Sequence, residues 1–237
     1  MDVGDGVKVW SHPNPNPHPN PHQDTPAILF SHGNSCDMLY ASMTTRRIAQ
    51  ITGCVTYGYD YYGYGLSVTP SAVSLCREKP RSVSQQDIYD NMSQVLAHVC
   101  ALHPRVILVG ESLGSAPTCF GAAAAALSHR VQSVVLLCPF VSVLAVAFRR
   151  TRPLPLLDLF NNIEHATNIQ CPVFVIHGSR DALIPESHGR ELAAAAPRGQ
   201  FIGVPLASHG DLWDAEVTLD VLRGAVAGSA TRILTQE

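Results

Sequence analysis

The chain has 237 residues and a formal net charge of −3 at pH 7, and 46% of its residues are hydrophobic. An α/β chain of this length commonly holds a single core, and its hydrophobic content excludes a disordered protein. The basic residues are scattered, so there is no electrostatic basis for binding a nucleic acid. We therefore expect one globular domain over residues 1–237.

The first predicted strand covers residues 7–10, and a segment rich in Pro, Asn and His follows at 11–23. Proline stands at every second position through most of this segment. Since proline fixes φ and removes a backbone donor, we expect an extended, solvated loop. His12, His18 and His22 have no acidic or thiol partner within the segment, so no metal site is expected.

From Ala27 onward, apolar runs alternate with helical patterns. The predicted strands are 27–31, 54–59, 105–109, 133–138, 173–177 and 201–204. The predicted helices are 38–52, 85–102, 112–127, 185–196 and 211–227. Buried strands that alternate with helices are typical of a parallel sheet covered on both faces. The sequence therefore predicts an α/β fold that binds its ligand at the carboxyl ends of the strands.

Residues 131–148 are uncharged and flanked by arginines, so a membrane-spanning helix is one interpretation. Pro139 and several polar residues interrupt this stretch, which favours a buried strand followed by a loop and a short helix. The Leu-, Pro- and Phe-rich segment 139–170 breaks the alternation. We expect it to form a cap over the active site, with an ordinary long connection as the alternative.

The seven cysteines are dispersed and form no Cys-x-x-Cys pair. This pattern indicates buried free thiols in a reducing compartment rather than a zinc or redox site. No secretory signal is recognised, and the expected localisation is cytoplasmic, with peripheral membrane contact as an option. No cofactor is expected.

The most informative motif is Gly110-Glu111-Ser112-Leu113-Gly114, which lies between a predicted strand and a predicted helix. A strand that enters a helix through a tight turn raises the serine hydroxyl above the sheet, and glycines are needed where the two backbones nearly touch. Ser112 is therefore the candidate nucleophile. Glu111 is interpreted as a polar turn residue of unknown role.

A serine nucleophile needs a base, usually a histidine that a carboxylate holds in one tautomer. Where the serine stands on such a strand–turn–helix corner, the acid follows the serine in the chain and the histidine comes last. Asp181 follows the predicted strand 173–177, and His209 follows the predicted strand 201–204. These two residues are the preferred partners of Ser112. The alternatives are Asp158 and Asp211 for the acid, and His177 and His188 for the base.

Acyl transfer also needs hydrogen-bond donors for the developing oxyanion. One donor is expected from the backbone N–H of Leu113. The second is expected from the loop after residues 27–31, where Gly33 lets the backbone turn inward and Asn34 carries the N–H. The aromatic segment 57–67 is interpreted as a rigid loop that supports this oxyanion loop, with ligand stacking as the alternative.

Together these residues resemble the α/β-hydrolase family from Ala27 to about Asp220. The finer pattern is similar to the depalmitoylating group called α/β-hydrolase domain-containing protein 17. The segments that carry this similarity are 29–34, 59–67, 146–148, 175–178 and 187–189. Around His209 the chain reads Ala207-Ser208-His209, where that group usually has Gly-x-Gly-His.

The resemblance implies a serine thioesterase that removes palmitate from S-acylated cysteines of membrane-bound proteins. It also implies Ser112 as nucleophile, Asp181 as its acid partner and His209 as base. The expected substrate is an S-acylated protein or a small acyl ester. The alternatives are a serine peptidase of the prolyl-oligopeptidase or aminopeptidase type, and a non-catalytic hydrolase-like binding protein.

Overall fold

The computed structural model describes residues 2–3, 7–13, 25–34, 36, 38–65, 67, 83–149 and 158–228. Eight strands in this part of the chain form one sheet in the order β1-β2-β4-β3-β5-β6-β7-β8. The strands are β1 (Asp2–Val3), β2 (Val7–His12), β3 (Ala27–Ser31), β4 (Thr56–Tyr59), β5 (Val106–Glu111), β6 (Val131–Leu137), β7 (Val173–Gly178) and β8 (Gly199–Val204). The pairs β1–β2 and β2–β4 are antiparallel and the others are parallel. The predicted α/β architecture is confirmed.

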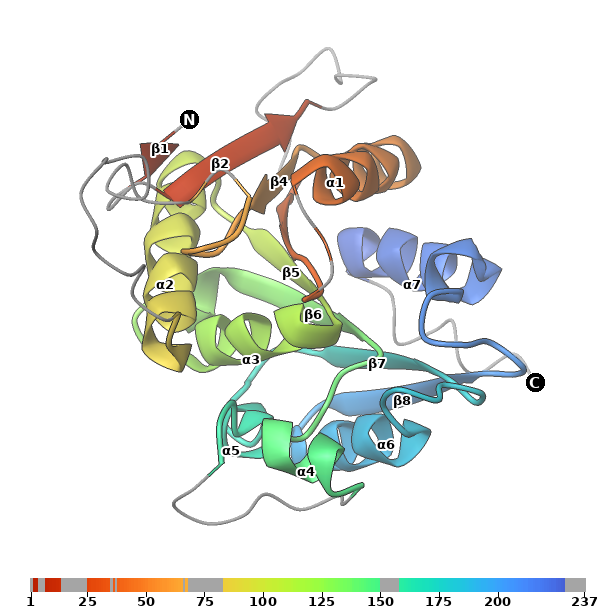
Figure 1. Ribbon diagram of the computed structural model, residues 1–237. Helices are drawn as coiled ribbons and strands as arrows, with labels where there is room; N and C mark the ends of the chain where they lie inside the picture. The colour runs from red at the N-terminus through yellow and green to blue at the C-terminus, as the bar shows by residue number, and fades with distance from the viewer. Residues whose placement is uncertain are drawn as a thin grey trace.

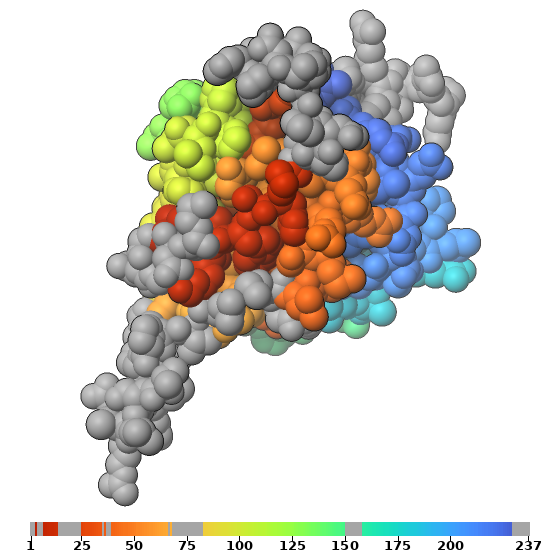
Figure 2. Space-filling model, turned by 90° about the horizontal axis from the view of Figure 1, so that it is seen from above, coloured from red at the N-terminus to blue at the C-terminus, as the bar shows by residue number. Residues whose placement is uncertain are grey.

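Helices cover both faces of the sheet (Figure 1). The α-helices are α1 (Met38–Thr52), α2 (Gln85–Leu102), α3 (Ser115–Ala123), α4 (Val143–Ala147), α5 (Asn162–Ala166), α6 (Glu186–Ala195) and α7 (Glu216–Ala227). The short 3₁₀ helices are η2 (Ser112–Gly114), η3 (Ser128–Arg130) and η4 (Leu212–Asp214). Helices α2, α3 and α6 pack with one buried cluster, and α1 and α7 pack with a second cluster on the opposite face. From above, β2 crosses the surface beside α1, with α7 beyond it (Figure 2).

The central strands β3 and β5 are buried along their whole length, because parallel strands covered on both faces have no solvent side. Local signals set the ends of two helices. Ser84 and Asp87 form a reciprocal capping box at the start of α2. Gly228 ends α7 in the left-handed conformation, with φ 67°.

Several predicted boundaries were wrong. The predicted helix 112–127 is divided into η2 and α3, and α3 ends at Ala123, because Ala124 is extended and a turn follows it. The strand β1 was not expected. Ser11 and His12 belong to β2, where they pair with β4, so the predicted loop 11–23 begins later than expected. Residues 14–23 of that loop, which include His18 and His22, lie outside the described residues.

The uncharged stretch 131–148 forms β6, a connection and α4, as the preferred interpretation requires. None of the helices in the described part of the chain combines the length and apolar composition needed to cross a bilayer. The predicted cap 139–170 contains α4 and α5, and its residues 150–157 lie outside the described residues.

Candidate active site

Ser112 lies directly after β5, at the start of η2. Its φ of 51° is in the left-handed region, where a non-glycine residue is strained. A Cβ on Gly110 would lie 2.5 Å from Thr118 Oγ1, and a Cβ on Gly114 would lie 2.0 Å from the carbonyl oxygen of Ser31. Both positions therefore need glycine, because the neighbouring backbones leave no room for a side chain. This is the strand–turn–helix corner that the Gly-x-Ser-x-Gly pattern predicts.

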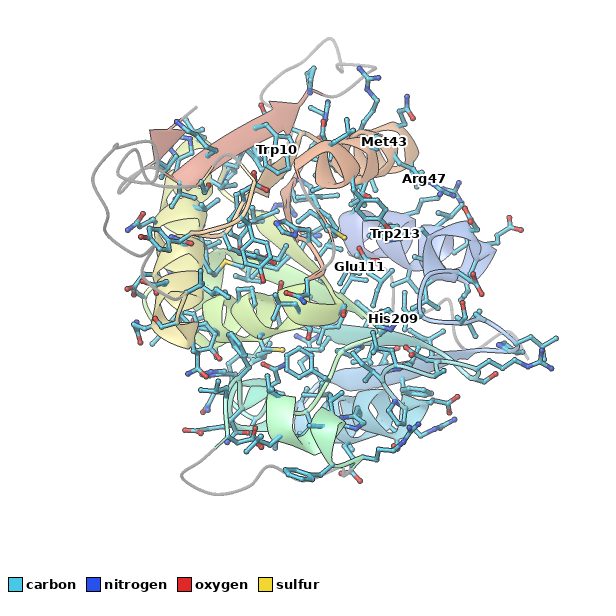
Figure 3. The ribbon with its side chains drawn as sticks, viewed as in Figure 1. Trp10, Met43, Arg47, Glu111, His209 and Trp213 are labelled. Atoms are coloured by element: carbon cyan, nitrogen blue, oxygen red, sulfur yellow. The ribbon has the colours of Figure 1, made fainter. Side chains whose placement is uncertain are left out.

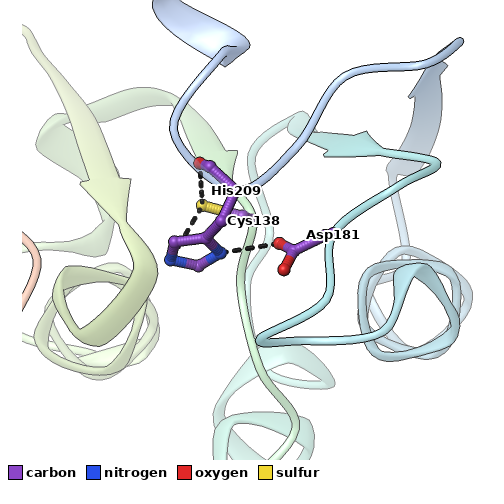
Figure 4. A group of neighbouring side chains, drawn as sticks. All are labelled: Cys138, Asp181 and His209. Atoms are coloured by element: carbon purple, nitrogen blue, oxygen red, sulfur yellow. Dashed lines mark hydrogen bonds and ion pairs between the residues drawn. The ribbon is translucent and has the colours of Figure 1, made fainter.

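The His209 imidazole lies between Ser112 and Asp181. Its Nε2 is 3.1 Å from Ser112 Oγ, and its Nδ1 is 2.6 Å from Asp181 Oδ2, an interaction that Figure 4 shows. The three side chains follow β5, β7 and β8, whose carboxyl ends lie at one edge of the sheet. The structure thus brings the three predicted residues into one hydrogen-bonded line.

The Asp181 carboxylate is held by several donors. Its Oδ1 accepts hydrogen bonds from the backbone N–H groups of Leu183 (2.9 Å) and Ile184 (2.8 Å). Its Oδ2 lies 2.6 Å from His209 Nδ1 and 3.3 Å from His177 Nε2. Burial would raise the pKa of Asp181, but hydrogen bonds from the two imidazoles and the Ile184 amide outweigh it and hold the pKa well below its ordinary value. Asp181 is therefore ionised at neutral pH and favours a proton on His209 Nδ1.

The two alternative acids serve local turns instead. Asp158 accepts hydrogen bonds from Ser142 Oγ (2.5 Å) and from the Leu144 amide (2.8 Å) at the start of α4. Asp211 accepts a 2.8 Å hydrogen bond from the Ser208 amide. Asp181 is the acid that the structure places at His209.

The two alternative bases are packed inside the fold. Both His177 and His188 are fully buried. His177 Nε2 donates a 2.9 Å hydrogen bond to the Ile184 carbonyl, and His188 Nδ1 accepts one of 3.3 Å from the Val141 amide. The imidazole at Ser112 belongs to His209, whose side chain is 26% exposed.

The two predicted oxyanion donors border the same cleft as Ser112. Asn34 and Leu113 line it together with the serine. A Cβ on Gly33 would lie 3.5 Å from the Ser112 Cβ, so the loop after β3 passes next to the serine. Leu113 is the second residue of η2. The first N–H groups of a helix have no partner within the helix, so the N–H of Leu113 can bind a ligand. Both residues therefore lie next to the serine, and their role as oxyanion donors stays a prediction.

The aromatic loop supports the loop that carries Asn34, as expected. The Tyr61 hydroxyl donates a 2.7 Å hydrogen bond to the His32 carbonyl, and the two rings pack with centroids 4.4 Å apart. The Tyr64 hydroxyl donates a 2.6 Å hydrogen bond to Asn34 Oδ1. Beneath them, His32 Nε2 lies 3.6 Å from Asp60 Oδ1, with both side chains fully buried. The loop after β3 is thus held by both side-chain and ring contacts.

A cleft of about 430 Å³ opens beside Ser112. Apolar side chains from the 139–170 segment and from the loop after β7 form much of its wall: Phe140, Val143, Val146, Ala147, Leu183 and Ile184. This volume lies within the range of small-molecule sites, and the apolar wall suits a hydrocarbon chain. Part of the predicted cap therefore borders the site.

Cys138 was not singled out from the sequence for any chemistry. It directly follows β6, with φ 39°, and its Sγ lies 3.8 Å from His209 Nε2 and 3.7 Å from the His209 carbonyl oxygen (Figure 4). The ligand atoms of Cys138, Asp181 and His209 all lie within 4.8 Å of one another, so they could hold a metal ion. The signal for Cys138 was its place at the end of a strand at the ligand-binding edge.

Glu111 is a buried carboxyl group in the same region, at the end of β5 rather than in a turn. It lies near Trp213, between the sheet and the α1–α7 layer (Figure 3). Burial raises the pKa of Glu111, against the opposing influence of the Trp213 indole and of His209 and His32.

Comparison with known proteins identifies the family. The model of the "Alpha/beta hydrolase family" matches residues 28–168, which is more than half of the chain. The chain belongs to the alpha/beta hydrolase family. The matched range contains Ser112, whereas Asp181 and His209 lie beyond it.

Curated relatives support the finer resemblance. The chain is 32% identical over 190 residues to alpha/beta hydrolase domain-containing protein 17C of Homo sapiens, covering 78% of this chain and 53% of that protein. It is 30% identical over 208 residues to alpha/beta hydrolase domain-containing protein aho-3 of Caenorhabditis elegans, covering 87% and 59%. The chain therefore spans a little more than half the length of these relatives.

Solved structures agree on the fold. Esterase RhEst1 from Rhodococcus sp. ECU1013 superposes with a TM-score of 0.69 at 16% identity, covering 95% of this chain and 97% of that chain. Est1E from Butyrivibrio proteoclasticus, solved with ferulic acid, gives a TM-score of 0.68 at 13% identity, covering 98% and 100%. At these identities the likeness shows the fold alone, and the family match supports hydrolase activity.

Proposed function

We propose that this alpha/beta hydrolase is a serine hydrolase that cleaves acyl thioesters or esters through a covalent acyl-enzyme. The observation that carries the proposal is the line of two hydrogen bonds, 3.1 Å from Ser112 Oγ to His209 Nε2 and 2.6 Å from His209 Nδ1 to Asp181 Oδ2. In such a line the histidine accepts the serine proton and the carboxylate stabilises the imidazolium that forms.

The reaction begins when Ser112 Oγ attacks the substrate carbonyl carbon and its proton passes to His209 Nε2. The carbonyl oxygen becomes an oxyanion, which accepts hydrogen bonds from the backbone N–H groups of Asn34 and Leu113. When the tetrahedral intermediate collapses, the thiol or alcohol leaves with the proton from His209. A water molecule, deprotonated by His209, then attacks the acyl-serine and releases the carboxylic acid.

The substrate class is proposed to be long-chain acyl groups, with palmitate on the cysteines of membrane-bound proteins as the preferred case. The apolar cleft beside Ser112 supports a hydrocarbon chain as the acyl part. The similarity to alpha/beta hydrolase domain-containing protein 17C supports the depalmitoylating group. Such a substrate places the enzyme in the cytoplasm with peripheral contact to membranes.

The test combines a fluorophosphonate probe with a palmitoyl-thioester reporter. The native protein should be labelled and should hydrolyse the reporter, whereas Ser112→Ala should lose both properties. Ser128→Ala, which changes a serine in η3, is the matched control and should keep both. Labelling that persists in Ser112→Ala would show that another residue is the nucleophile.

A second experiment addresses the substrate class. Turnover is measured over a series of acyl-chain lengths with and without vesicles, and on a panel of aminoacyl amides. Faster turnover of long-chain thioesters supports the proposal. Preferential cleavage of the amides would show a peptidase instead, and a folded protein with no turnover of activated esters would show a binding protein.

A further inference from the structure

Cys138 adds a soft metal ligand to the candidate active site. Its Sγ is 3.8 Å from His209 Nε2, and Ser112 Oγ is 3.1 Å from the same nitrogen. In a tetrahedral zinc site, a Zn–S bond of about 2.3 Å and a Zn–N bond of about 2.0 Å place the two ligand atoms about 3.5 Å apart. The observed sulfur–nitrogen distance differs from this value by a few tenths of an ångström.

The other side of the imidazole is also arranged as in a metal site. A histidine that binds a metal usually donates its second ring N–H to a carboxylate, which fixes the tautomer and the ring orientation. Here His209 Nδ1 is 2.6 Å from Asp181 Oδ2. The bond that orients the imidazole for proton transfer therefore also presents the Nε2 lone pair to a cation.

The charges around the thiol favour a cation as well. A carboxylate oxygen of Asp181 lies within 4.8 Å of the Cys138 sulfur. Its negative charge attracts a divalent ion, whose binding displaces the thiol proton. An ion can reach the site, because Ser112 lines the cleft and the neighbouring His209 side chain is partly exposed.

We propose that Zn²⁺ binds to His209 Nε2 and Cys138 Sγ, with Ser112 Oγ and water as further ligands, and that the bound ion inhibits the hydrolase. On binding, the thiol proton passes to solvent and no group is oxidised or reduced. The Nε2 lone pair is then shared with zinc and cannot accept the Ser112 proton. The inhibition rests on the proposed function, whereas the metal binding does not.

Metal binding is tested without an activity assay by titrating the native chain with Co²⁺, which gives a thiolate-to-metal charge-transfer band when a cysteine ligates it. We expect a band that saturates at one equivalent and disappears in Cys138→Ser. Cys100→Ser, which changes a buried free cysteine in α2, is the matched control and should keep the band. A missing band in the native chain, or a band that persists in Cys138→Ser, would overturn the proposal.

Inhibition is then measured with Zn²⁺ in a chelator-buffered series. Loss of a residue that only hydrogen-bonds to a metal ligand weakens metal binding by about 10–100-fold. Loss of the Cys138 ligand itself should therefore weaken Zn²⁺ inhibition by about 100-fold. Cys138→Ala should behave in the same way, which guards against misfolding of one variant. A native enzyme that turns over normally with the site saturated would overturn the inhibitory role. A Cys138-dependent band in a protein without hydrolase activity would support the metal site and contradict the proposed function.

Discussion

Replacing Tyr61 by Phe tests whether the aromatic loop holds the oxyanion loop in place. The Tyr61 hydroxyl donates a 2.7 Å hydrogen bond to the carbonyl of His32, two residues before Asn34, and both side chains are fully buried. Phenylalanine keeps the ring contact with the imidazole but removes this donor. The His32 carbonyl is then free to move, and the Asn34 amide moves with it.

The size of the effect follows from this geometry. A buried acceptor that loses its donor costs about 1–3 kcal/mol of stability. At about 2–4 °C per kcal/mol for a domain of this size, the Tm should fall by about 2–12 °C. Removing an oxyanion donor lowers kcat by about 10²–10³-fold, and displacing one should cost less, so we expect kcat to fall by about 10-fold to 100-fold. The KM should change much less.

Tyr57→Phe is the matched control. Tyr57 belongs to β4, and its hydroxyl is 2.8 Å from Nε2 of His103, which lies between the end of α2 and the start of β5. This variant should lose stability but keep its kcat, as measured by thermal unfolding and ester hydrolysis below both Tm values. If Tyr61→Phe also keeps its kcat, the aromatic loop only stabilises the fold and the reasoning is wrong.

Three further substitutions test the site. Gly114→Ala places a Cβ 2.0 Å from the Ser31 carbonyl oxygen, so this variant should be unstable in unfolding assays and inactive in esterase assays. In Gly210→Ala the added Cβ has no atom within 4 Å, so this control should match the native chain. Asp181→Asn should lower kcat by about 10⁴-fold. The lowered pKa of Asp181 stabilises the fold above about pH 4, which is the pKa of the carboxyl group in the unfolded chain, and this stabilisation is lost as the pH falls. Asp181→Asn should therefore lose less stability on acidification than the native chain does. Equal losses would contradict the assignment. Because the pKa of Glu111 is raised in the fold, its effect on stability has the opposite pH dependence: the stability that it contributes is present below about pH 4 and is lost as the pH rises. Glu111→Gln should therefore raise the Tm at pH 7 more than at pH 4. An unchanged Tm at both pH values would refute this.

The parts of the fold that were predicted correctly are those with strong local signals. The bounds of β3, α1 and α2 agree with the prediction to the residue, because continuous apolar runs and long amphipathic patterns mark them clearly. The Gly-x-Ser-x-Gly corner was predictable because the motif itself is local, although only Gly110 is required by atoms of the same segment, whereas Gly114 is required by the backbone of Ser31 at the end of β3. The order of strands and helices then placed Asp181 and His209 at the same edge.

The parts that were missed depend on contacts between distant segments. The alanines at 122–126 run past the end of α3 without a Gly or Pro among them, so the end of the helix at Ala123 could not be predicted from composition. The extension of β2 to His12 depends on its pairing with β4, which outweighs the loop character of the following residues. Cys138 looked like one of several buried thiols, and only the pairing of β6 between β5 and β7 shows what it faces.

This strand order explains why Cys138 lies beside the His209 imidazole. The strands β5, β6, β7 and β8 are consecutive neighbours, and three of them are followed by Ser112, Asp181 and His209. His209 must reach from beyond β8 to the serine after β5, so it passes over the end of β6, where residue 138 stands. The Cys138 sulfur therefore lies beside the His209 imidazole. A thiol there leaves the hydrogen-bonded line of Ser112, His209 and Asp181 intact and supplies the sulfur of the proposed zinc site, so the proposed sensitivity to zinc depends on one residue outside the line itself.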